Sequence, residues 1–363
     1  MVEGAGMRVV YDNIIFSLQK AGGISVYWSE LAKRARQLES VKFYEHPNRN
    51  IFRGNLAITP CTESHMSPRV LRYLPFLKKL DDCSIFHSSY YRVALQKNVV
   101  NVTTVHDFTY EHYRKGLARK VHSAQKRFAV LRSDGIICVS ENTKRDLLNL
   151  YPETPDENIR VIYNGVGEEF FIDAQAESKL ETICADLAVR QYILFVGDRI
   201  NYKNFDVALE VLSRLPNYKF VIIGGQHLNG AEKQKLAPLG LRVVHLRGVS
   251  SETLNILYNG ALCLLYPSAY EGFGIPVLEA MKAGCPVVST NSSSIPEVAG
   301  DAALLVDVIS PEQILEKIAL LENDVFRNGC VGRGLVNAAA FSWDKCFSET
   351  LAFYKELHKK KFA

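Results

Sequence analysis

The sequence predicts an α/β protein made of two domains, each containing a parallel β-sheet with helices on both faces. The chain has 363 residues, which exceeds the usual size of one hydrophobic core. In both halves, short apolar runs typical of buried strands alternate with amphipathic stretches typical of helices. The apolar runs are too short to span a bilayer, and no secretory signal pattern is present. We therefore expect a globular cytoplasmic protein.

The first half opens with a strand, a glycine turn and a helix. Ser140 precedes a helical stretch as an N-cap, and Asn164-Gly165 is typical of a turn. The expected elements are a strand at 8–14, a tight loop at Gly22-Gly23, a helix at 24–37, a strand at 98–106, a helix at 111–131, a strand at 135–139, a helix to Leu150 and a strand at 159–163.

The second half repeats this alternation, and one of its strands runs into Gly224-Gly225. The expected strands are 192–196, 218–223, 242–246, 261–266, 285–289 and 303–306. The expected helices are 204–214, 231–237, 251–259, 275–283, 311–321 and 343–359.

The stretch 167–190 is acidic and shows no strand pattern, so we place the domain junction there. The predicted domains are 1–170 and 171–342, and the helix in 343–363 is expected to pack back on the first. Ligands of parallel sheets bind beyond the carboxyl ends of the strands, so the two domains should face a central cleft.

Charge is distributed unevenly along the chain. Residues 1–145 carry 23 Lys+Arg against 12 Asp+Glu, or +11, and the remainder carries 20 against 27, or −7. The basic half indicates an anionic partner, either a membrane surface or a nucleic acid. Nucleic-acid binding is the distant alternative, because strands with interleaved aromatic and basic residues are missing.

No metal or cofactor is predicted. The eight cysteines form no Cys-x-x-Cys pair, which indicates reduced thiols rather than disulfides or a zinc site. No Asp-x-Asp and no cluster of His, Asp and Glu with ligand spacing is present. Residues 1–6 precede a second methionine, Met7, so their status as native sequence stays open.

The segment from Ser268 to Gly284 carries the clearest chemistry. It places Glu271 and Glu279 eight residues apart across a glycine-bearing turn, between an expected strand and an expected helix. The turn presents backbone N–H groups and a positive helix end to an anion. Two carboxylates beside a phosphate site suit a nucleotide-sugar, whose hydroxyls they would bind.

A second motif, Gly197-Asp-Arg199-Ile-Asn-Tyr-Lys203-Asn204, follows the first strand of the second domain. Arg199 and Lys203 lie four residues apart and could converge on one anion. A guanidinium fork together with an ammonium group suits a diphosphate.

These motifs, with Gly22-Gly23, Val105-His106-Asp107, Cys138-Val-Ser140 and Asn164-Gly165, resemble the retaining glycosyltransferases of family 4, which have the GT-B fold. The resemblance runs nearly end to end and implies two Rossmann-like domains. It also implies hexose transfer from a nucleoside-diphosphate sugar to a hydroxyl of a glycan acceptor. GDP-mannose is the favoured donor, with UDP- and dTDP-sugars as alternatives.

The resemblance also implies residue roles. Arg199 and Lys203 would bind the donor diphosphate, and Glu271 would contact the donor sugar. Glu279 would bind the ribose, and His106 would approach the transferred sugar. Further donor-binding positions are Gly23, Gly197, Asn204, Val249, Phe273, Gly274 and Ile275, and the acceptor side would be lined by Gly22, Asp107, Ser140 and Asn164.

Structural roles remain open for some of these residues: His106 also fits a core histidine, and Ser140 an N-cap. The mechanism we expect is same-face transfer, in which the leaving phosphate oxygen takes the acceptor proton. Double displacement would need a carboxylate near the anomeric carbon, for which Asp107 is the candidate. The alternative activities are transfer to a soluble small acceptor, epimerisation of a sugar-nucleotide, and phosphorolysis.

The acceptor is expected to be lipid-linked, as in surface polysaccharide or O-antigen synthesis. The segment 68–80 mixes aromatic and apolar residues with four cations, and a basic stretch follows from Arg114 to Arg132. Both could contact the inner face of an anionic plasma membrane.

Overall fold

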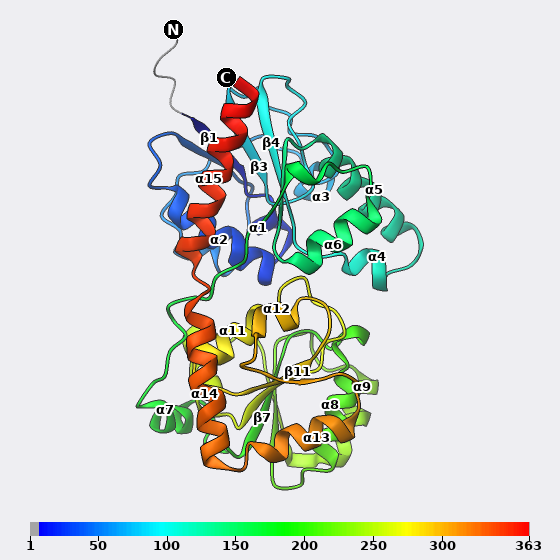
Figure 1. Cartoon of the computed structure of the whole chain (residues 1–363), viewed down its shortest axis with the longest axis vertical. Helices are drawn as coiled ribbons and strands as arrows, with labels where there is room; N and C mark the ends of the chain where they lie inside the picture. Colours follow the sequence, from blue (N-terminus) through cyan, green and yellow to red (C-terminus); the bar gives the residue numbers. More distant parts are fainter. Residues whose placement is uncertain (1–6, 363) are drawn as a thin grey trace. The chain divides into compact units, whose positions relative to one another are not determined.

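The structure is a computed structural model that describes residues 7–362. Internal contacts divide the chain into two compact units. Unit 1 runs to Gly165 and resumes at Trp343, and unit 2 runs from Val166 to Ser342. The chain therefore leaves unit 1, builds unit 2, and returns to unit 1 as its last helix, α15 (Trp343–Phe362; red in Figure 1).

Unit 1 contains a six-stranded parallel sheet in the order β2-β1-β3-β4-β5-β6. Its strands are β1 (Arg8–Asp12), β2 (Val41–Tyr44), β3 (Ser84–Ser88), β4 (Val99–Val105), β5 (Gly135–Cys138) and β6 (Ile159–Val161). Its helices besides α15 are α1 (Ile15–Leu18), α2 (Gly23–Ala35), α3 (Pro68–Leu71), α4 (Thr109–Tyr113), α5 (Gly116–Arg132) and α6 (Glu141–Leu150), with 3-10 turns η1 (Arg53–Asn55) and η2 (Asp156–Asn158).

Unit 2 contains a second six-stranded parallel sheet in the order β12-β11-β10-β7-β8-β9. Its strands are β7 (Tyr192–Val196), β8 (Lys219–Ile223), β9 (Val243–Leu246), β10 (Cys263–Tyr266), β11 (Val287–Thr290) and β12 (Leu304–Val306). Its helices are α7 (Ala176–Ile183), α8 (Phe205–Ser213), α9 (Gly230–Leu236), α10 (Ser251–Gly260), α11 (Ile275–Lys282), α12 (Ile295–Ala299), α13 (Pro311–Leu320) and α14 (Asp324–Ala339), with 3-10 turns η3 (Asn201–Lys203) and η4 (Ala237–Arg242).

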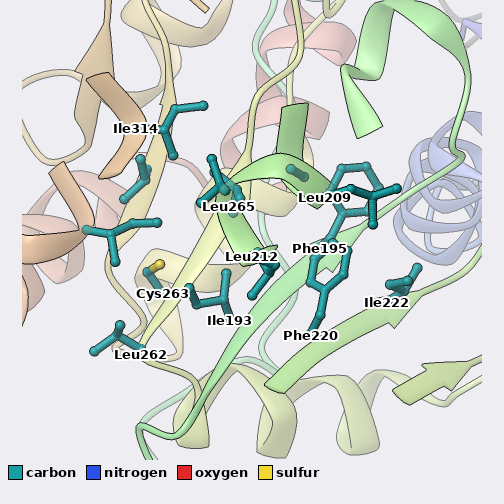
Figure 2. Close-up of a cluster of buried hydrophobic side chains, with 14 of the residues drawn as sticks. Ile193, Phe195, Leu209, Leu212, Phe220, Ile222, Leu262, Cys263, Leu265 and Ile314 are labelled. Atoms are coloured by element: carbon teal, nitrogen blue, oxygen red, sulfur yellow. The ribbon is translucent and has the colours of Figure 1, made fainter. Parts of the chain in front are cut away.

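The unit 2 core explains why its strands read as continuous apolar runs. Central strands β7 and β10 are covered on both faces, so almost every side chain is buried. Figure 2 shows Phe195 and Phe220 of neighbouring strands packing with Leu209 and Leu212 of α8. Both sheets confirm the predicted two-domain α/β fold.

The helix α15 belongs to the unit 1 core. Phe353 and Leu357 are buried, and a Cβ built on Gly135 would lie 2.3 Å from Leu357 Cδ1. The helix therefore rests directly on the start of β5, and it also packs against α2. The prediction that the last helix returns to the first domain is confirmed.

One expected helix of unit 1 is two helices in the structure. The helix predicted at 111–131 is broken at Arg114 and Lys115, both extended, and α5 restarts at Gly116 with φ +77°. An ion pair between Glu111 and Lys126 joins the two helices across this break.

Sequence patterns also missed the strands β2 and β3 and the helices α1, α3, α7, α12 and α14. Strand β3 is fully buried although its sequence, Ser-Ile-Phe-His-Ser, is half polar, because its polar groups are hydrogen-bonded inside the unit. Helix α14 contains three glycines that weaken its helical pattern. Gly334 lets α14 approach α11, since a Cβ there would lie 3.3 Å from Met281 Cγ.

Candidate active site

The strand order of unit 2 reverses between β7 and β10. Counted from its first strand, the sheet has the order 3-2-1-4-5-6 typical of dinucleotide-binding folds. Ligands of such sheets bind at this switch point, outside the carboxyl ends of the two central strands. The loop after β7 carries Gly197 to Lys203, and the loop after β10 carries Glu271. The topology thus places both motifs at the switch point.

Lys203 and Glu271 form an ion pair across these two loops. Lys203 Nζ also donates to the hydroxyl of Tyr266 at 3.0 Å. The side chains of Lys203 and Glu271 are 11% and 12% exposed, so the pair is partly shielded but open to a ligand. A charge-assisted contact in this setting is stronger than one at the open surface.

The backbone holds the two loops together. Asn204 ends η3 in the left-handed conformation, with φ 50°, and its side-chain amide donates to Pro267 O at 2.8 Å. The amide of Ala269 donates to Tyr202 O at 2.7 Å. Asn204 therefore acts as a structural joint beside Lys203, in a conformation that Asn tolerates well.

Two serines after β11 shape the glutamate turn. Ser293 Oγ accepts the amide of Glu271 at 2.8 Å, and Ser294 Oγ donates to the carbonyls of Glu271 and Phe273, each at 3.0 Å. The turn ends at Gly274, which has φ +99° and precedes the first residue of α11, Ile275. The positive end of α11 therefore opens directly beside Glu271, as an anion site requires.

Glu279 lies on α11 and accepts a hydrogen bond from Tyr258 Oη at 3.1 Å. Burial raises the pKa of Glu279 to about 7; the hydrogen bond from Tyr258 lowers it and the charge of Glu169 raises it. Burial raises the pKa of Tyr266 well above 10, and the charges of Glu271 and Glu279 both contribute. Tyr266 therefore marks a neighbourhood that both glutamates share with Lys203.

Arg199 lies in the same loop after β7, but its side chain has other partners. Its Nε donates to Glu232 Oε1 at 2.8 Å, and its Nη2 donates to Gln226 O at 2.6 Å. It lines a hollow of about 330 Å³ between α8 and α9, together with Asn229 and Lys235. The structure brings Lys203, Glu271 and Glu279 together but gives Arg199 different partners. Val249 lies half-buried in the loop before α10, and Gly197 has φ +128° at the end of β7.

The predicted residues of unit 1 also follow strand ends. His106 comes directly after β4, and its ring lies edge-on to Tyr27 of α2, with 4.9 Å between centroids. Burial lowers the pKa of His106 to about 4; Asp107 opposes this shift and Lys126 adds to it. His106 is therefore neutral at pH 7, and its buried Nε2 has no hydrogen-bond partner among the described residues.

The other unit 1 positions have varied environments. Ser140 caps α6 because its Oγ accepts a hydrogen bond from the amide of Thr143 at 3.0 Å. This confirms the N-cap that the sequence predicted at Ser140. Asn164 is 4% exposed, and its Oδ1 has no hydrogen-bond partner within residues 7–362. Gly22 has φ +152°, directly before Gly23 begins α2. Asp107 accepts the amide of Thr109 at 3.0 Å.

Sequence analysis missed several residues that organise the site. The glutamates are held by Tyr258 of α10, by Tyr266 at the end of β10, and by Ser293 and Ser294 after β11. In the sequence, Lys126 belongs to the basic stretch from Arg114 to Arg132 that was expected to contact a membrane. It is instead fully buried, and its Nζ donates to Glu111 Oε2 and to the carbonyl of Asp107, each at 2.8 Å.

Three further findings concern the described residues as a whole. Between residues 7 and 362, no group of three or more His, Cys, Asp and Glu side chains could hold a metal ion. All eight cysteines are free thiols. No helix in this range combines the length and apolar character needed to cross a bilayer.

Comparison with known proteins gives two family matches. Residues 21–170 match the model described as Glycosyltransferase Family 4, and residues 188–329 match Glycosyl transferases group 1. Over 269 residues, the chain is 30% identical to the O-antigen chain mannosyltransferase B of Escherichia coli, covering 70% of each chain.

Solved structures show the same fold at lower identity. Sucrose-phosphate synthase of Thermosynechococcus elongatus aligns with a TM-score of 0.75 and 18% identity, covering 98% of this chain and 100% of the other. HepE of Anabaena, in complex with UDP and glucose, aligns with a TM-score of 0.74 and 16% identity, covering 95% and 99%.

Proposed function

Because the chain belongs to the family 4 glycosyltransferases, which have the GT-B fold, we propose that it transfers a hexose, with retention of configuration, from a nucleoside-diphosphate sugar to a glycan hydroxyl. The favoured donor is GDP-mannose, which the similarity to an O-antigen mannosyltransferase supports. UDP-hexoses come next, since HepE was solved with UDP and glucose. A dTDP-sugar is the third candidate.

The observation that carries this proposal is the Lys203–Glu271 pair beside Tyr266 at the switch point of unit 2. Lys203 supplies a positive charge for the donor diphosphate, and Glu271 is positioned to accept sugar hydroxyls. When the donor enters, its phosphate replaces Glu271 as a partner of Lys203. Pre-aimed cations and amides at a departing phosphate are usually the largest catalytic contribution.

Other donor contacts follow from the same loops. The backbone at Phe273, Gly274 and Ile275, at the start of α11, is the proposed cradle for the phosphates. Glu279, when ionised, accepts the ribose hydroxyls, and Val249 lies against the base. Arg199 stays a predicted ligand of the diphosphate. Gly197 and Asn204 shape the loop that carries Lys203.

In unit 1, the neutral imidazole of His106 is proposed to hydrogen-bond the transferred sugar or the acceptor. Its buried Nε2, which has no hydrogen-bond partner within residues 7–362, supports this role. Gly22 and Gly23 allow close approach of the substrate to the backbone, and Asp107 and Asn164 line the acceptor side. No cofactor or metal is part of the proposal.

The proposed chemistry breaks the bond between the anomeric carbon and the diphosphate oxygen. The acceptor oxygen then bonds to the anomeric carbon on the same face, and its proton passes to the departing phosphate oxygen. Lys203 stabilises the charge that develops on the diphosphate. NMR of the product tests this step: an inverted anomeric configuration contradicts it, and a covalent sugar on Asp107 would support double displacement instead.

A panel of donors and acceptors tests the activity itself. The protein is incubated with GDP-mannose, UDP-glucose or dTDP-rhamnose, with polyprenyl-diphosphate glycans or with soluble sugars. We expect donor-dependent extension of the lipid-linked glycan. Conversion of the donor without acceptor would indicate an epimerase, and dependence on phosphate a phosphorylase. Transfer only to soluble sugars would overturn the lipid-linked acceptor.

A surface of α5, which we name the α5 surface, supports a lipid-linked acceptor at the cytoplasmic face of the membrane. Leu117, Val121, Phe128 and Leu131 are 76%, 41%, 43% and 40% exposed, and their spacing puts them on one helix face. The helix also carries four arginines and lysines besides the buried Lys126, and no acidic residue. Apolar residues flanked by cations suit an anionic bilayer surface.

Vesicle co-sedimentation tests the α5 surface. The double variant Leu117→Glu/Phe128→Glu should lose binding to vesicles containing phosphatidylglycerol. Val325→Glu/Val336→Glu on α14 is the matched control, since these valines are 83% and 77% exposed. Equal binding by both variants, or equal wild-type binding to neutral and anionic vesicles, would contradict a role for this surface.

A further inference from the structure

A cavity of about 490 Å³ lies in unit 1 at the carboxyl end of β2. Its lining begins with Glu45 and His46, which directly follow the strand, and extends through the next loop as far as Thr62. Because the sheet is parallel, the cavity lies at the same edge as His106, which follows β4. This is the edge at which ligands of such sheets bind. No residue assigned so far to donor or acceptor lines the cavity.

Asn50 fixes the loop that forms the cavity. Its side-chain amide donates to Gln19 O at 2.9 Å and to Ser25 Oγ at 2.8 Å. Its Oδ1 accepts two backbone amides of its own loop, at 3.0 and 3.3 Å. Asn50 is 5% exposed and uses both of its donors and both acceptor lone pairs, so the loop is tied to the segment around Gly22 and Gly23. The cavity is therefore preformed, as ligand sites usually are.

The charges that line the cavity neutralise each other. Glu45 is the one carboxylate among the lining residues and Arg53 the one guanidinium, and the two form an ion pair. Glu45 also accepts a hydrogen bond from Asn13 Nδ2 at 2.9 Å. A phosphate would need a cation without a carboxylate partner, and a lipid chain would need an apolar lining, whereas most of these side chains are polar. The cavity therefore suits a neutral, polar ligand.

The lining side chains keep hydrogen-bonding capacity for such a ligand. Arg53 has five N–H donors, of which three are used by Glu45 and by two carbonyls of the same loop. Asn48 Nδ2 donates one of its two hydrogens to His46 O at 3.1 Å. Thr62 is exposed and adds a hydroxyl, which can donate and accept. Sugar hydroxyls, which also donate and accept, match this mixture of groups.

We propose that this cavity binds a neutral sugar unit of the acceptor glycan, remote from the hydroxyl that reacts. The inference rests on the proposed function, which places the reacting groups near His106. Strands β2 and β4 are three steps apart in the sheet, or about 14 Å. The sugar in the cavity is therefore one further along the chain than the reacting sugar. The cavity thus selects acceptors by their length and by the sugar at that position.

Transfer to acceptors of increasing length tests this subsite. Oligosaccharides of mannose, glucose and galactose with one to four residues are compared, with the donor that the wild type uses. In the preferred series, KM should fall from the shortest to the longest acceptor. The double variant Asn48→Ala/Thr62→Ala should raise the KM of the longest acceptor by about 5- to 50-fold, the effect of two hydrogen bonds. The loss should grow with acceptor length and appear in KM rather than in kcat.

Asn98→Ala is the matched control for the double variant. Asn98 is exposed and lies directly before β4, at the opposite edge of the sheet. Its substitution should leave the dependence of KM on acceptor length as in the wild type. The same length dependence in the double variant, or an equal loss at every acceptor length, would overturn the subsite.

Binding without catalysis separates the subsite from the proposed function. Saturation-transfer NMR measures binding of the tetrasaccharides to the full chain without a donor, with sodium pyrophosphate as competitor. We expect binding to the wild type and to Asn98→Ala, and weaker binding to the double variant. Absence of binding, displacement by pyrophosphate, or equal binding to all three proteins would overturn the subsite. Binding that depends on Asn48 and Thr62 in a protein that transfers no sugar would support the subsite and contradict the proposed function.

Discussion

Tyr258 donates its hydroxyl to Glu279 Oε2 at 3.1 Å, and this carboxyl is the one group at the candidate donor site whose pKa is raised to about 7. Burial disfavours its charged form. In the unfolded chain the same carboxyl titrates near its ordinary value of 4.5. Between these two values the folded protein binds more protons than the unfolded one, so folding stability falls as pH rises.

The first prediction concerns this pH dependence. The contribution of Glu279 is fully present below pH 4.5 and is lost as pH rises through about 7. Between pH 4.5 and pH 8 the free energy of unfolding should fall by at most roughly 3 kcal/mol through this group. Urea unfolding of the wild type and Glu279→Gln at pH 5 and pH 8 measures it. Identical pH slopes in the two proteins would contradict the raised pKa.

A second prediction follows for nucleotide binding. A ribose hydroxyl donates best to an ionised carboxylate, so GDP affinity should increase from pH 6 to pH 8 as Glu279 loses its proton. Glu279→Gln should bind more weakly and show a flatter pH profile. Affinity that is constant from pH 6 to pH 8 in the wild type would remove Glu279 from the ribose contact.

The third prediction concerns the ion pair at the switch point. Lys203→Ala and Glu271→Ala should each reduce transfer by about 100- to 1000-fold, the usual effect of removing one group that stabilises the transition state. Both variants should keep the far-UV circular dichroism of the wild type. Lys179→Ala is the matched control, because Lys179 is half-exposed and pairs with Asp173 in the same unit, away from both motifs. Near-native turnover by either site variant would exclude that residue.

Gly274 gives a fourth prediction. Alanine there must adopt φ +99°, and its Cβ would lie 2.9 Å from Ile295 Cδ1. We expect Gly274→Ala to lose at least about 1–2 kcal/mol of stability and to weaken diphosphate binding. The control is Gly332→Ala in α14, where the added Cβ meets nothing within 4 Å among the described residues beyond its chain neighbours and the backbone of its own helix. Equal midpoints and affinities for the two variants would contradict a special role for the turn.

The fifth prediction concerns the attachment of α15 to unit 1. The Tyr354 hydroxyl donates to Tyr11 Oη at 3.2 Å and accepts a hydrogen bond from His87 Nδ1. The other ring nitrogen of His87, Nε2, accepts from Thr104 Oγ1 at 2.8 Å. Burial lowers the pKa of His87 to about 3, which keeps the ring neutral. Tyr354→Phe would leave the buried His87 Nδ1 without its partner and cost about 1–3 kcal/mol.

Thermal and urea unfolding compare Tyr354→Phe with Lys355→Ala on the exposed side of the same helix turn. Lys355→Ala should stay within about 0.5 kcal/mol of the wild type. An equally small effect of Tyr354→Phe would show that the hydrogen-bonded chain through His87 contributes little to holding α15.

Local sequence patterns predicted the central strands β7 and β10 of unit 2, because burial on both faces produces continuous apolar runs such as 192–196 and 261–266. Strand β3 was missed because its serines and histidine satisfy their hydrogen bonds inside the unit, which no local pattern reveals. Helix α14 was missed because its three glycines give it a low helix propensity. The helix forms nevertheless because close packing against α11 at Gly334 offsets this low propensity. Tertiary contacts decide both cases.

For the candidate site too, the sequence indicated residues in local motifs but not their tertiary contacts. Glu271 and Lys203 could be found because each follows a strand end in a recognisable motif, and the switch point brings those ends together. The supporting groups are Tyr266, at the end of β10, and Ser293 and Ser294, after β11, and the sequence gives no signal of their contacts. Arg199 shows the limit most clearly, because its four-residue spacing from Lys203 cannot reveal that its side chain reaches Glu232.

Calorimetric titration of the wild type and Lys203→Gln with GDP and GDP-mannose, with UDP and dTDP in parallel, tests the central claim most directly. The account predicts that the wild type binds at least one of these nucleoside diphosphates and that Lys203→Gln loses about 10- to 100-fold in affinity. Absence of binding to every nucleotide in the panel, or equal affinities in the two proteins, would contradict a diphosphate site at the pair of Lys203 and Glu271.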